Sequence, residues 1–174
     1  MVFLSGDHTL DMNVTVANIS RLTICGEPSS GYVARVVCSG SVGLSFMSMV
    51  DFKTHSLTFT SCGRSFNKHG LRFDKYTLLL DSIKYAELVN CSFHENLGTA
   101  LVVHHTSITV AENNEFTHNH CAKRSIPNSC VGGGGIAAVH SNLTFIGNTT
   151  FLRNHATFGS ASIKYHHKRI SLGL

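Results

Sequence analysis

The amino-acid sequence predicts an all-β chain folded as a right-handed parallel β-helix, with about 23 residues in each coil. Three observations support this fold class. A seven-residue motif recurs at an interval of about one such coil. Short alternating runs rich in Val, Ile, Thr and Phe lie between turn residues and indicate many short strands. Trp is absent, Gly is common (15) and Pro is rare (2), which favours strands and turns over helices.

The recurring motif is N-x-x-F-x-x-N, which occurs three times with Phe93, Phe116 and Phe151 at its centre. The spacing along the chain is 23 between the first two phenylalanines and 35 between the last two, which is 23 plus 12. The additional length matches a polar segment at 121–131. We therefore expect this segment to leave the repeat as a loop, where binding residues often lie.

A degenerate copy of the motif precedes these three. Phe59 precedes Phe93 by 34, which is 23 plus 11, and the additional length fits the segment 64–74. We expect this segment to be a second loop, and the whole chain, 1–174, to be a single β-helix domain.

Each period contains about three short strands. The strands expected beside the motif are 107–110 and 142–145 before it, and 98–103, 134–139 and 159–163 after it. A βαβ unit needs about 30 residues or more, so this period is too short for one. Three strands per period make one coil of a parallel β-helix, and about six coils spaced by roughly 4.8 Å give a rod about 30 Å long.

The motif residues have structural roles in such a coil. The central phenylalanine should point inward and stack on its counterparts in neighbouring coils. The second asparagine should lie at a turn, where it tolerates the left-handed conformation and can bond from coil to coil. The expected structural stack consists of Phe59, Phe93, Phe116, Phe151, Asn96, Asn119 and Asn154.

The repeated F-x-x-N, at 93–96, 116–119 and 151–154, resembles the repeat of the polymorphic outer-membrane proteins. The partner motif of that family, G-G-A-[ILV], is present in weakened form at 133–136 and 98–101. The chain is most similar to right-handed β-helix proteins of sponges and other simple animals, which carry the same repeats. The resemblance implies an extracellular or surface-displayed solenoid, with adhesion known for some bacterial members.

Five N-x-[ST] sequons favour a secreted glycoprotein slightly. Their asparagines are Asn13, Asn18, Asn90, Asn142 and Asn148. Among six cysteines, Cys121 and Cys130 bracket the loop expected at 121–131 and would pair in an oxidising compartment. The alternative, to which we give equal weight, is that all six cysteines are small buried residues with free thiols.

The ends of the chain suggest that it is incomplete. The first residues turn polar too soon for a signal peptide, and the last residues stop abruptly. No run approaches the roughly 18 apolar residues of a membrane span, so we expect no membrane insertion within this segment.

Parallel β-helices also include polysaccharide lyases and glycoside hydrolases, and a glycosidase needs two carboxylates that face one groove. The ten acidic residues of this chain are dispersed, and in the 23-residue register no acid lies over another. The closest candidates are Glu112 and Glu115, with Glu95 one coil away. We therefore expect no catalytic residue.

Histidine is abundant, with 12 residues. A spacing that could bind zinc is formed by His118, His120, Cys121, His94 and His155. A role as polar residues at turns explains this group better. We interpret the histidine pairs at 104–105 and 166–167 likewise as turn or tail residues. The glycines at 132–135 lack the G-K-[ST] of a phosphate loop. The sequence thus predicts neither a metal nor a cofactor.

The net charge of +4 is modest and the basic residues are scattered, which argues against a nucleic-acid partner. We expect a non-enzymatic, extracellular or surface-displayed β-solenoid that serves as a structural or adhesive recognition module for extracellular proteins or glycans. The alternative is a carbohydrate-active β-helix enzyme of the polysaccharide lyase or glycoside hydrolase type. The arrangement of the acidic residues distinguishes the two.

Overall fold

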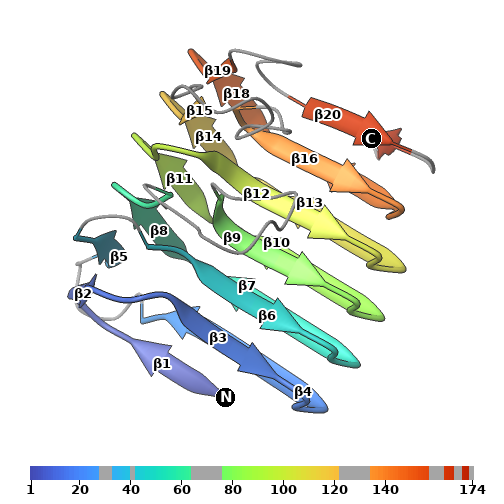
Figure 1. The fold of residues 1–174 in the computed structure, drawn as a ribbon, viewed down its shortest axis with the longest axis horizontal. Coiled ribbons are helices and arrows are strands. Elements are labelled where there is room, and N and C mark those ends of the chain that lie inside the picture. Colours follow the sequence, from blue (N-terminus) through green and yellow to red (C-terminus); the bar gives the residue numbers. More distant parts are fainter. Residues whose placement is uncertain are drawn as a thin grey trace.

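The computed structural model describes residues 1–27, 33–39, 42–63, 76–121, 134–156, 163–166 and 170–172. These residues form 21 strands and no helix, and they therefore contain no helix that could cross a membrane. Every pair of neighbouring strands is parallel, and the strands stack one above another from the N-terminus to the C-terminus (Figure 1). The prediction of an all-β, parallel β-helical fold is confirmed.

Three long sheets run the length of the stack. The first sheet contains β1 (Val2–Leu4), β4 (Arg21–Gly26), β7 (Asp51–His55), β10 (Tyr85–Val89), β13 (Ile108–Glu112), β17 (Leu143–Ile146) and β21 (Ile170–Leu172). The second contains β2 (Asp7–Leu10), β5 (Ala34–Cys38), β8 (Leu57–Thr60), β11 (Ser92–His94), β14 (Glu115–Thr117) and β18 (Thr150–Leu152). The third contains β3 (Val14–Ala17), β6 (Leu44–Met47), β9 (Tyr76–Asp81), β12 (Thr99–His104), β16 (Ile136–Val139) and β20 (Ile163–His166). A short additional pair joins β15 (His120–Cys121) to β19 (His155–Ala156).

The chain visits the first, second and third sheet in turn and then starts the next coil. Within the described ranges, six coils have a strand in all three sheets, and β21 begins a seventh. Between β11 and β14, Phe93 pairs with Phe116, so one coil has the length of the repeat period in the sequence. Apart from Cys121, the loops expected at 64–74 and 121–131 lie outside the described residues.

Four of the five strands expected beside the motif are observed, as β12, β13, β16 and β17, with ends within two residues of the expected ones. Most of the fifth, at 159–163, lies outside the described residues. Alternation of side chains between the inside and the outside of each strand fixes these positions, because a slip by one residue would expose the apolar set.

The core is a continuous column of side chains enclosed by the three sheets. The third sheet contributes a ladder of aliphatic residues, in which Leu44, Leu78, Leu101 and Ile136 are paired in register and buried. On the first sheet the large ring of Phe52 is followed by the small Ala86 in the next coil. Buried positions of different size therefore interdigitate, as close packing requires.

Phenylalanine rings form the inward ladder of the second sheet. Neighbouring ring centroids are 4.9 Å apart for Phe59 and Phe93, 4.8 Å for Phe93 and Phe116, and 4.9 Å for Phe116 and Phe151. The planes of the last two pairs differ by 3° and 7°. The ladder has the spacing of the strands themselves, so each of the four coils that contain β8, β11, β14 and β18 adds one ring to the stack.

A buried ladder of asparagines follows the phenylalanines. Asn119 Oδ1 accepts hydrogen bonds from the backbone N–H of Asn96 (3.2 Å) and from Asn96 Nδ2 (2.8 Å). Asn119 Nδ2 donates to the backbone oxygen of Phe93 (2.9 Å) and to Asn154 Oδ1 (2.9 Å). Each amide thus links its own coil to the neighbouring coils and satisfies backbone groups that the turn leaves unpaired.

Three corners connect the sheets, and each repeats a residue with positive φ. We call them the first corner (first to second sheet), the second corner (second to third) and the third corner (third back to first). At the second corner this residue is Ser61, Glu95, His118 or Arg153, with φ between 52° and 59°. The expectation that the second asparagine of the motif takes this conformation is wrong, because the residue before it does so instead. That residue turns outward, so the asparagine after it can point into the core.

Glycine is required where two coils approach closely. A Cβ atom on Gly134, just before β16, would lie 2.5 Å from the backbone oxygen of His155. The close approach accounts for this glycine on structural grounds.

A disulfide joins two adjacent coils between Cys38 and Cys62, whose Cα atoms are 4.8 Å apart. The sequence separation of 24 is one coil plus one residue, so the repeat period could have predicted this disulfide. Cys25 and Cys91 have free thiols, and burial raises the pKa of Cys91 to about 11. Cys121 is buried and disulfide-bonded, while Cys130, its expected partner, lies outside the described residues.

Candidate functional site

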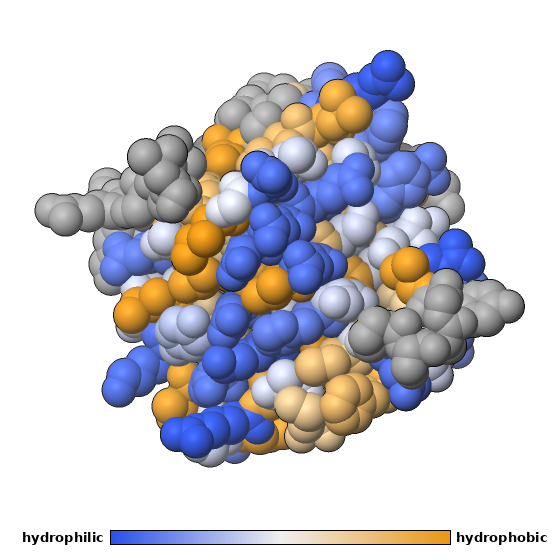
Figure 2. Space-filling view, turned by 180° about the vertical axis from the view of Figure 1, so that it is seen from behind, coloured by the Kyte–Doolittle hydropathy of each residue, from blue (hydrophilic) through white to orange (hydrophobic). Residues whose placement is uncertain are grey.

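The outer surface of the stack carries the chemistry that could serve a function. On the face shown in Figure 2, hydrophilic side chains fill the centre and hydrophobic ones interrupt them in short stretches. Because neighbouring strands are in register, outward side chains from successive coils lie side by side in ladders. Four groups of polar side chains stand out on these ladders and corners.

The first cluster lies on the outer face of the first sheet, where β7 and β10 are adjacent. Lys53 pairs in register with Glu87, and Lys53 Nζ is 2.9 Å from Glu87 Oε2. Tyr85 donates from its hydroxyl to the same carboxylate oxygen (3.3 Å), and Lys53 Nζ lies 5.4 Å from the centre of the Tyr85 ring. The strands therefore hold an acid, a base and an aromatic ring against one another.

The electrostatics of this cluster favour the charged pair. The hydrogen bond from Lys53 lowers the pKa of Glu87, with burial acting in the opposite direction. The bond to Glu87 raises the pKa of Lys53. Burial, followed by the charge of Glu87, raises the pKa of Tyr85. At neutral pH the three groups thus form an ion pair with a neutral phenol, in which no group is poised to exchange a proton.

The Glu87 pair should make a pH-dependent contribution to stability. A carboxyl group with a lowered pKa in the folded state stabilises the protein above its unfolded pKa of about 4.3, and this contribution is lost as the pH falls through the folded value. We expect Glu87→Gln to lower the free energy of unfolding by about 0.5–1 kcal/mol at pH 7, because the pair is partly exposed. The difference from the parent protein should shrink toward zero near pH 3.

Urea denaturation at several pH values checks this expectation. Glu112→Gln is the matched control, since Glu112 lies at the end of β13 on the same sheet and forms no ion pair with the described residues. A Glu87→Gln effect of the same size at pH 3 and pH 7 would mean that the pair contributes nothing through its charge.

The second sheet carries another ion pair between neighbouring coils. Arg35 donates two hydrogen bonds to the carboxylate of Asp7, at 2.8 Å from Nε and 2.9 Å from Nη2. The hydrogen bonds to Asp7 raise the pKa of Arg35. Both side chains are about half exposed, at 52% and 53%, so the pair fixes the local surface more than it stabilises the fold.

The acidic residues that the sequence offered as the best catalytic candidates do not form a cluster. Glu112 ends β13 on the first sheet, and Glu115 begins β14 on the second sheet, on the two sides of the first corner. Glu95 lies at the second corner, where it contacts His94 at 3.3 Å. The three carboxylates are not among the described groups of three potential ligands that lie within 4.8 Å of one another.

The histidines around the second corner form two pairs of neighbouring rings. His120 and His155 are opposite each other in β15 and β19, with ring centroids 4.6 Å apart. His94 and His118 meet edge to face at 5.6 Å. Cys121 is disulfide-bonded, which removes the thiolate that the sequence placed among these candidate zinc ligands.

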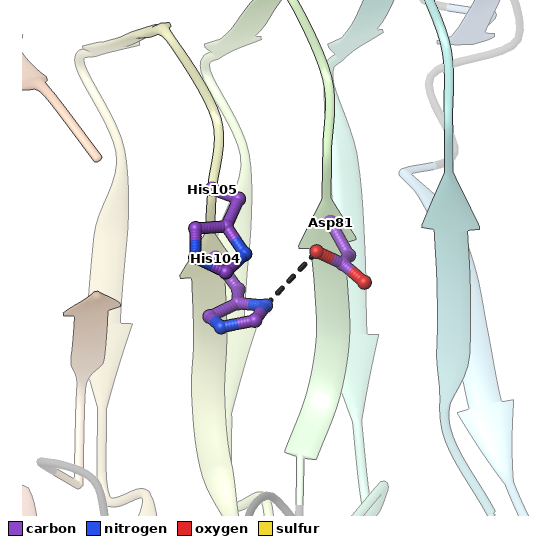
Figure 3. A group of neighbouring side chains, drawn as sticks. All are labelled: Asp81, His104 and His105. Carbon is purple, nitrogen blue, oxygen red and sulfur yellow. Dashed lines mark hydrogen bonds and ion pairs between the residues drawn. The ribbon is translucent and has the colours of Figure 1, made fainter. Parts of the chain in front are cut away.

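The fourth group lies at the third corner, where the sequence predicted only polar turn residues at 104–105. His104, the last residue of β12, donates from Nδ1 to Oδ1 of Asp81, the last residue of β9 (2.9 Å). The ring of His105 lies 3.9 Å from that of His104, centre to centre. Figure 3 shows the two imidazoles one above the other beside the carboxylate of the neighbouring strand. Asp81 and His104 are one 23-residue period apart, so the repeat could have revealed this pair.

The five sequon asparagines differ in their surroundings. Asn18, Asn90 and Asn148 are exposed, and the first two have positive φ at corners. Asn13 Oδ1 accepts a hydrogen bond from the backbone N–H of Gly43 (3.0 Å), and Asn142 Nδ2 donates to the backbone oxygen of Ser107 (2.9 Å). The amide nitrogen that a glycan would occupy is therefore in structural use at Asn142.

The chain matches no protein-family model, no curated protein and no solved structure. The fold assignment rests on the strand pairing, and the function must be inferred from the surface.

Proposed function

We propose that this chain is a non-catalytic β-solenoid that binds extracellular glycans or proteins through its outer faces. One observation carries the proposal. Two ion pairs on the outer faces join neighbouring coils, Lys53 with Glu87 and Arg35 with Asp7. In the described part of the chain, the carboxylates of Glu95, Glu112 and Glu115 are not gathered around one point where a bond could be broken. Such an arrangement presents fixed hydrogen-bonding groups but supplies no acid and base that face each other across a substrate.

The scaffold suits repeated contacts with an extended partner. Each coil contributes similar outward positions at the spacing of parallel strands, roughly 4.8 Å. A rigid ladder of this kind loses little conformational entropy on binding. The net charge of +4 attracts acidic chains over neutral ones, so an acidic polysaccharide is the preferred first probe.

The proposal is tested with polygalacturonate and with neutral dextran as the control. Retention of the protein on immobilised polymer measures binding, and release of new chain ends measures cleavage. We expect retention that weakens with salt on the acidic polymer, little retention on dextran and no new chain ends. Cleavage of either polymer would replace the proposal with the carbohydrate-active enzyme, and absence of binding to both would direct the search to protein partners.

Replacing Glu95, Glu112 and Glu115 together by glutamine should leave the fold and the binding activity largely unchanged. The three side chains are exposed or half-buried, so we expect each to change the free energy of unfolding by no more than about 0.5 kcal/mol. Circular dichroism, thermal unfolding and the retention assay check the triple variant. If the parent protein cleaved a polysaccharide and this variant did not, the acidic residues would be catalytic.

A further inference from the structure

We propose that Asp81, His104 and His105 form a binding site for a divalent transition-metal ion, best suited to Zn²⁺, at the third corner. Among the described residues, these three are the one group of His, Cys, Asp or Glu side chains whose potential ligand atoms all lie within 4.8 Å of one another. The inference is independent of the proposed binding of glycans or proteins.

The repeat itself brings the three side chains together. Asp81 and His104 are paired in register at the ends of β9 and β12, so both project from the same face of the third sheet. His105 follows with a φ of 48°, and this left-handed turn places its ring beside that of His104 instead of on the opposite face. One residue from each of two coils and one corner residue thus converge on the same point.

A neighbouring ring restricts the orientation of His105. His140 occupies the equivalent corner position one coil later, with a φ of 51°, and its ring stacks on that of His105 at 5.0 Å and 15°. A ligand held in this way loses less side-chain entropy when it binds an ion.

The donor set matches zinc. Two imidazoles and one carboxylate are the three-ligand set of open zinc sites, with bonds of about 2.0–2.2 Å and a fourth position left for water. Ligands at that bond length are about 3.3 Å apart in a tetrahedron. The Asp81 and His104 atoms are already 2.9 Å apart, so an ion can replace the proton that they now share, and His105, whose ligand atom lies within 4.8 Å of the other two, closes the remaining distance by a small shift of its stacked ring.

The position is accessible from solvent. Asp81 and His104 are partly exposed, at 20% and 26% of their side chains, and His105 is exposed. An ion can therefore reach the corner without any movement of the backbone. The partial burial of the other two ligands limits competition by water for the bound ion.

Zinc titration of the purified chain by calorimetry tests the site. We expect about one Zn²⁺ per chain, and at least a tenfold loss of affinity in both His105→Gly and Asp81→Asn. Glycine suits the positive φ at 105 and asparagine keeps the shape of Asp81, so both variants should fold, which circular dichroism verifies. His118→Gly is the matched control: it removes an exposed histidine with a φ of 54° from the second corner.

Cobalt provides a second readout of the ligands. Co²⁺ at this site should give a ligand-field spectrum without the thiolate charge-transfer band that Cys25 or Cys91 would produce, and the spectrum should be lost in His105→Gly. Absence of zinc binding to the parent chain, a thiolate band, or equal losses in His105→Gly and His118→Gly would each overturn the proposal.

Discussion

Replacing Phe116 by alanine should lower the free energy of unfolding by about 3–5 kcal/mol. The side chain is fully buried, at 0% exposure, and its ring is stacked on both faces, by Phe93 at 4.8 Å and by Phe151 at 4.9 Å. Truncation removes the transfer free energy of the ring and leaves a cavity in the middle of the stack. The coils on either side cannot close it, because their spacing is fixed by the backbone hydrogen bonds of three sheets.

Denaturation by urea measures the loss, with Phe3→Ala as the control. Phe3 is also a strand phenylalanine, but it is 63% exposed in the first coil, so its truncation should change stability by less than about 1 kcal/mol. A Phe116→Ala effect below that of Phe3→Ala would mean that the ring does not lie in the core.

Replacing Asn119 by leucine should cost about 3 kcal/mol, although leucine has nearly the same shape and is more apolar. The substitution removes the acceptor for the backbone N–H and the side-chain amide of Asn96, and the donor to the backbone oxygen of Phe93. Each buried polar group left without a partner costs about 1–3 kcal/mol. Because leucine has the same branching as asparagine and is no smaller, the substitution leaves no cavity, and the loss reports on the missing hydrogen bonds.

Asn148→Leu is the control for this substitution. Asn148 lies in the next coil and is exposed, so the same change of side chain should alter stability by no more than about 0.5 kcal/mol. If Asn119→Leu were neutral or stabilising, the asparagine ladder would not hold the coils together, and burial of apolar surface alone would account for the stack.

The aromatic ladder was predictable because one residue type recurs once per coil, at an interval of 23 residues that is lengthened only where a segment is inserted. Phe93 and Phe116 mark a coil without insertion, and this pair alone sets the period. The same column begins with His8 and Val36, which lie opposite each other in β2 and β5. Neither resembles phenylalanine, so the repeat in the first coils could be seen only after the strands were paired.

The outer clusters were missed because polar residues were not aligned as the phenylalanines were. Lys53 and Glu87 are separated by one period and the inserted segment 64–74, which is the same spacing of 34 that separates Phe59 from Phe93. In the other direction Glu87 pairs with Val110 without an insertion, in the register of β10 and β13. Asp81 and His104 lie one uninterrupted period apart and could have been paired had polar residues been aligned as the phenylalanines were.

The second corner could not be read from residue type. Left-handed positions usually indicate glycine or asparagine, yet Glu95, His118 and Arg153 take this conformation here, with φ from 52° to 54°. The coil geometry imposes the turn, and the hydrogen bonds of the following asparagine offset its cost. The sequence motif pointed to the asparagine, whereas the residue before it takes the left-handed conformation.

The most direct test of the coil register is a nuclear Overhauser spectrum of the chain labelled on its phenylalanine rings. The structure predicts contacts between Phe59 and Phe93, between Phe93 and Phe116, and between Phe116 and Phe151, whose ring centroids are 4.8–4.9 Å apart. Rings two coils apart should give none, because a whole ring lies between them. A contact between Phe93 and Phe151, or the absence of the contact between Phe93 and Phe116 in the folded protein, would contradict the register on which the fold and the outer clusters depend.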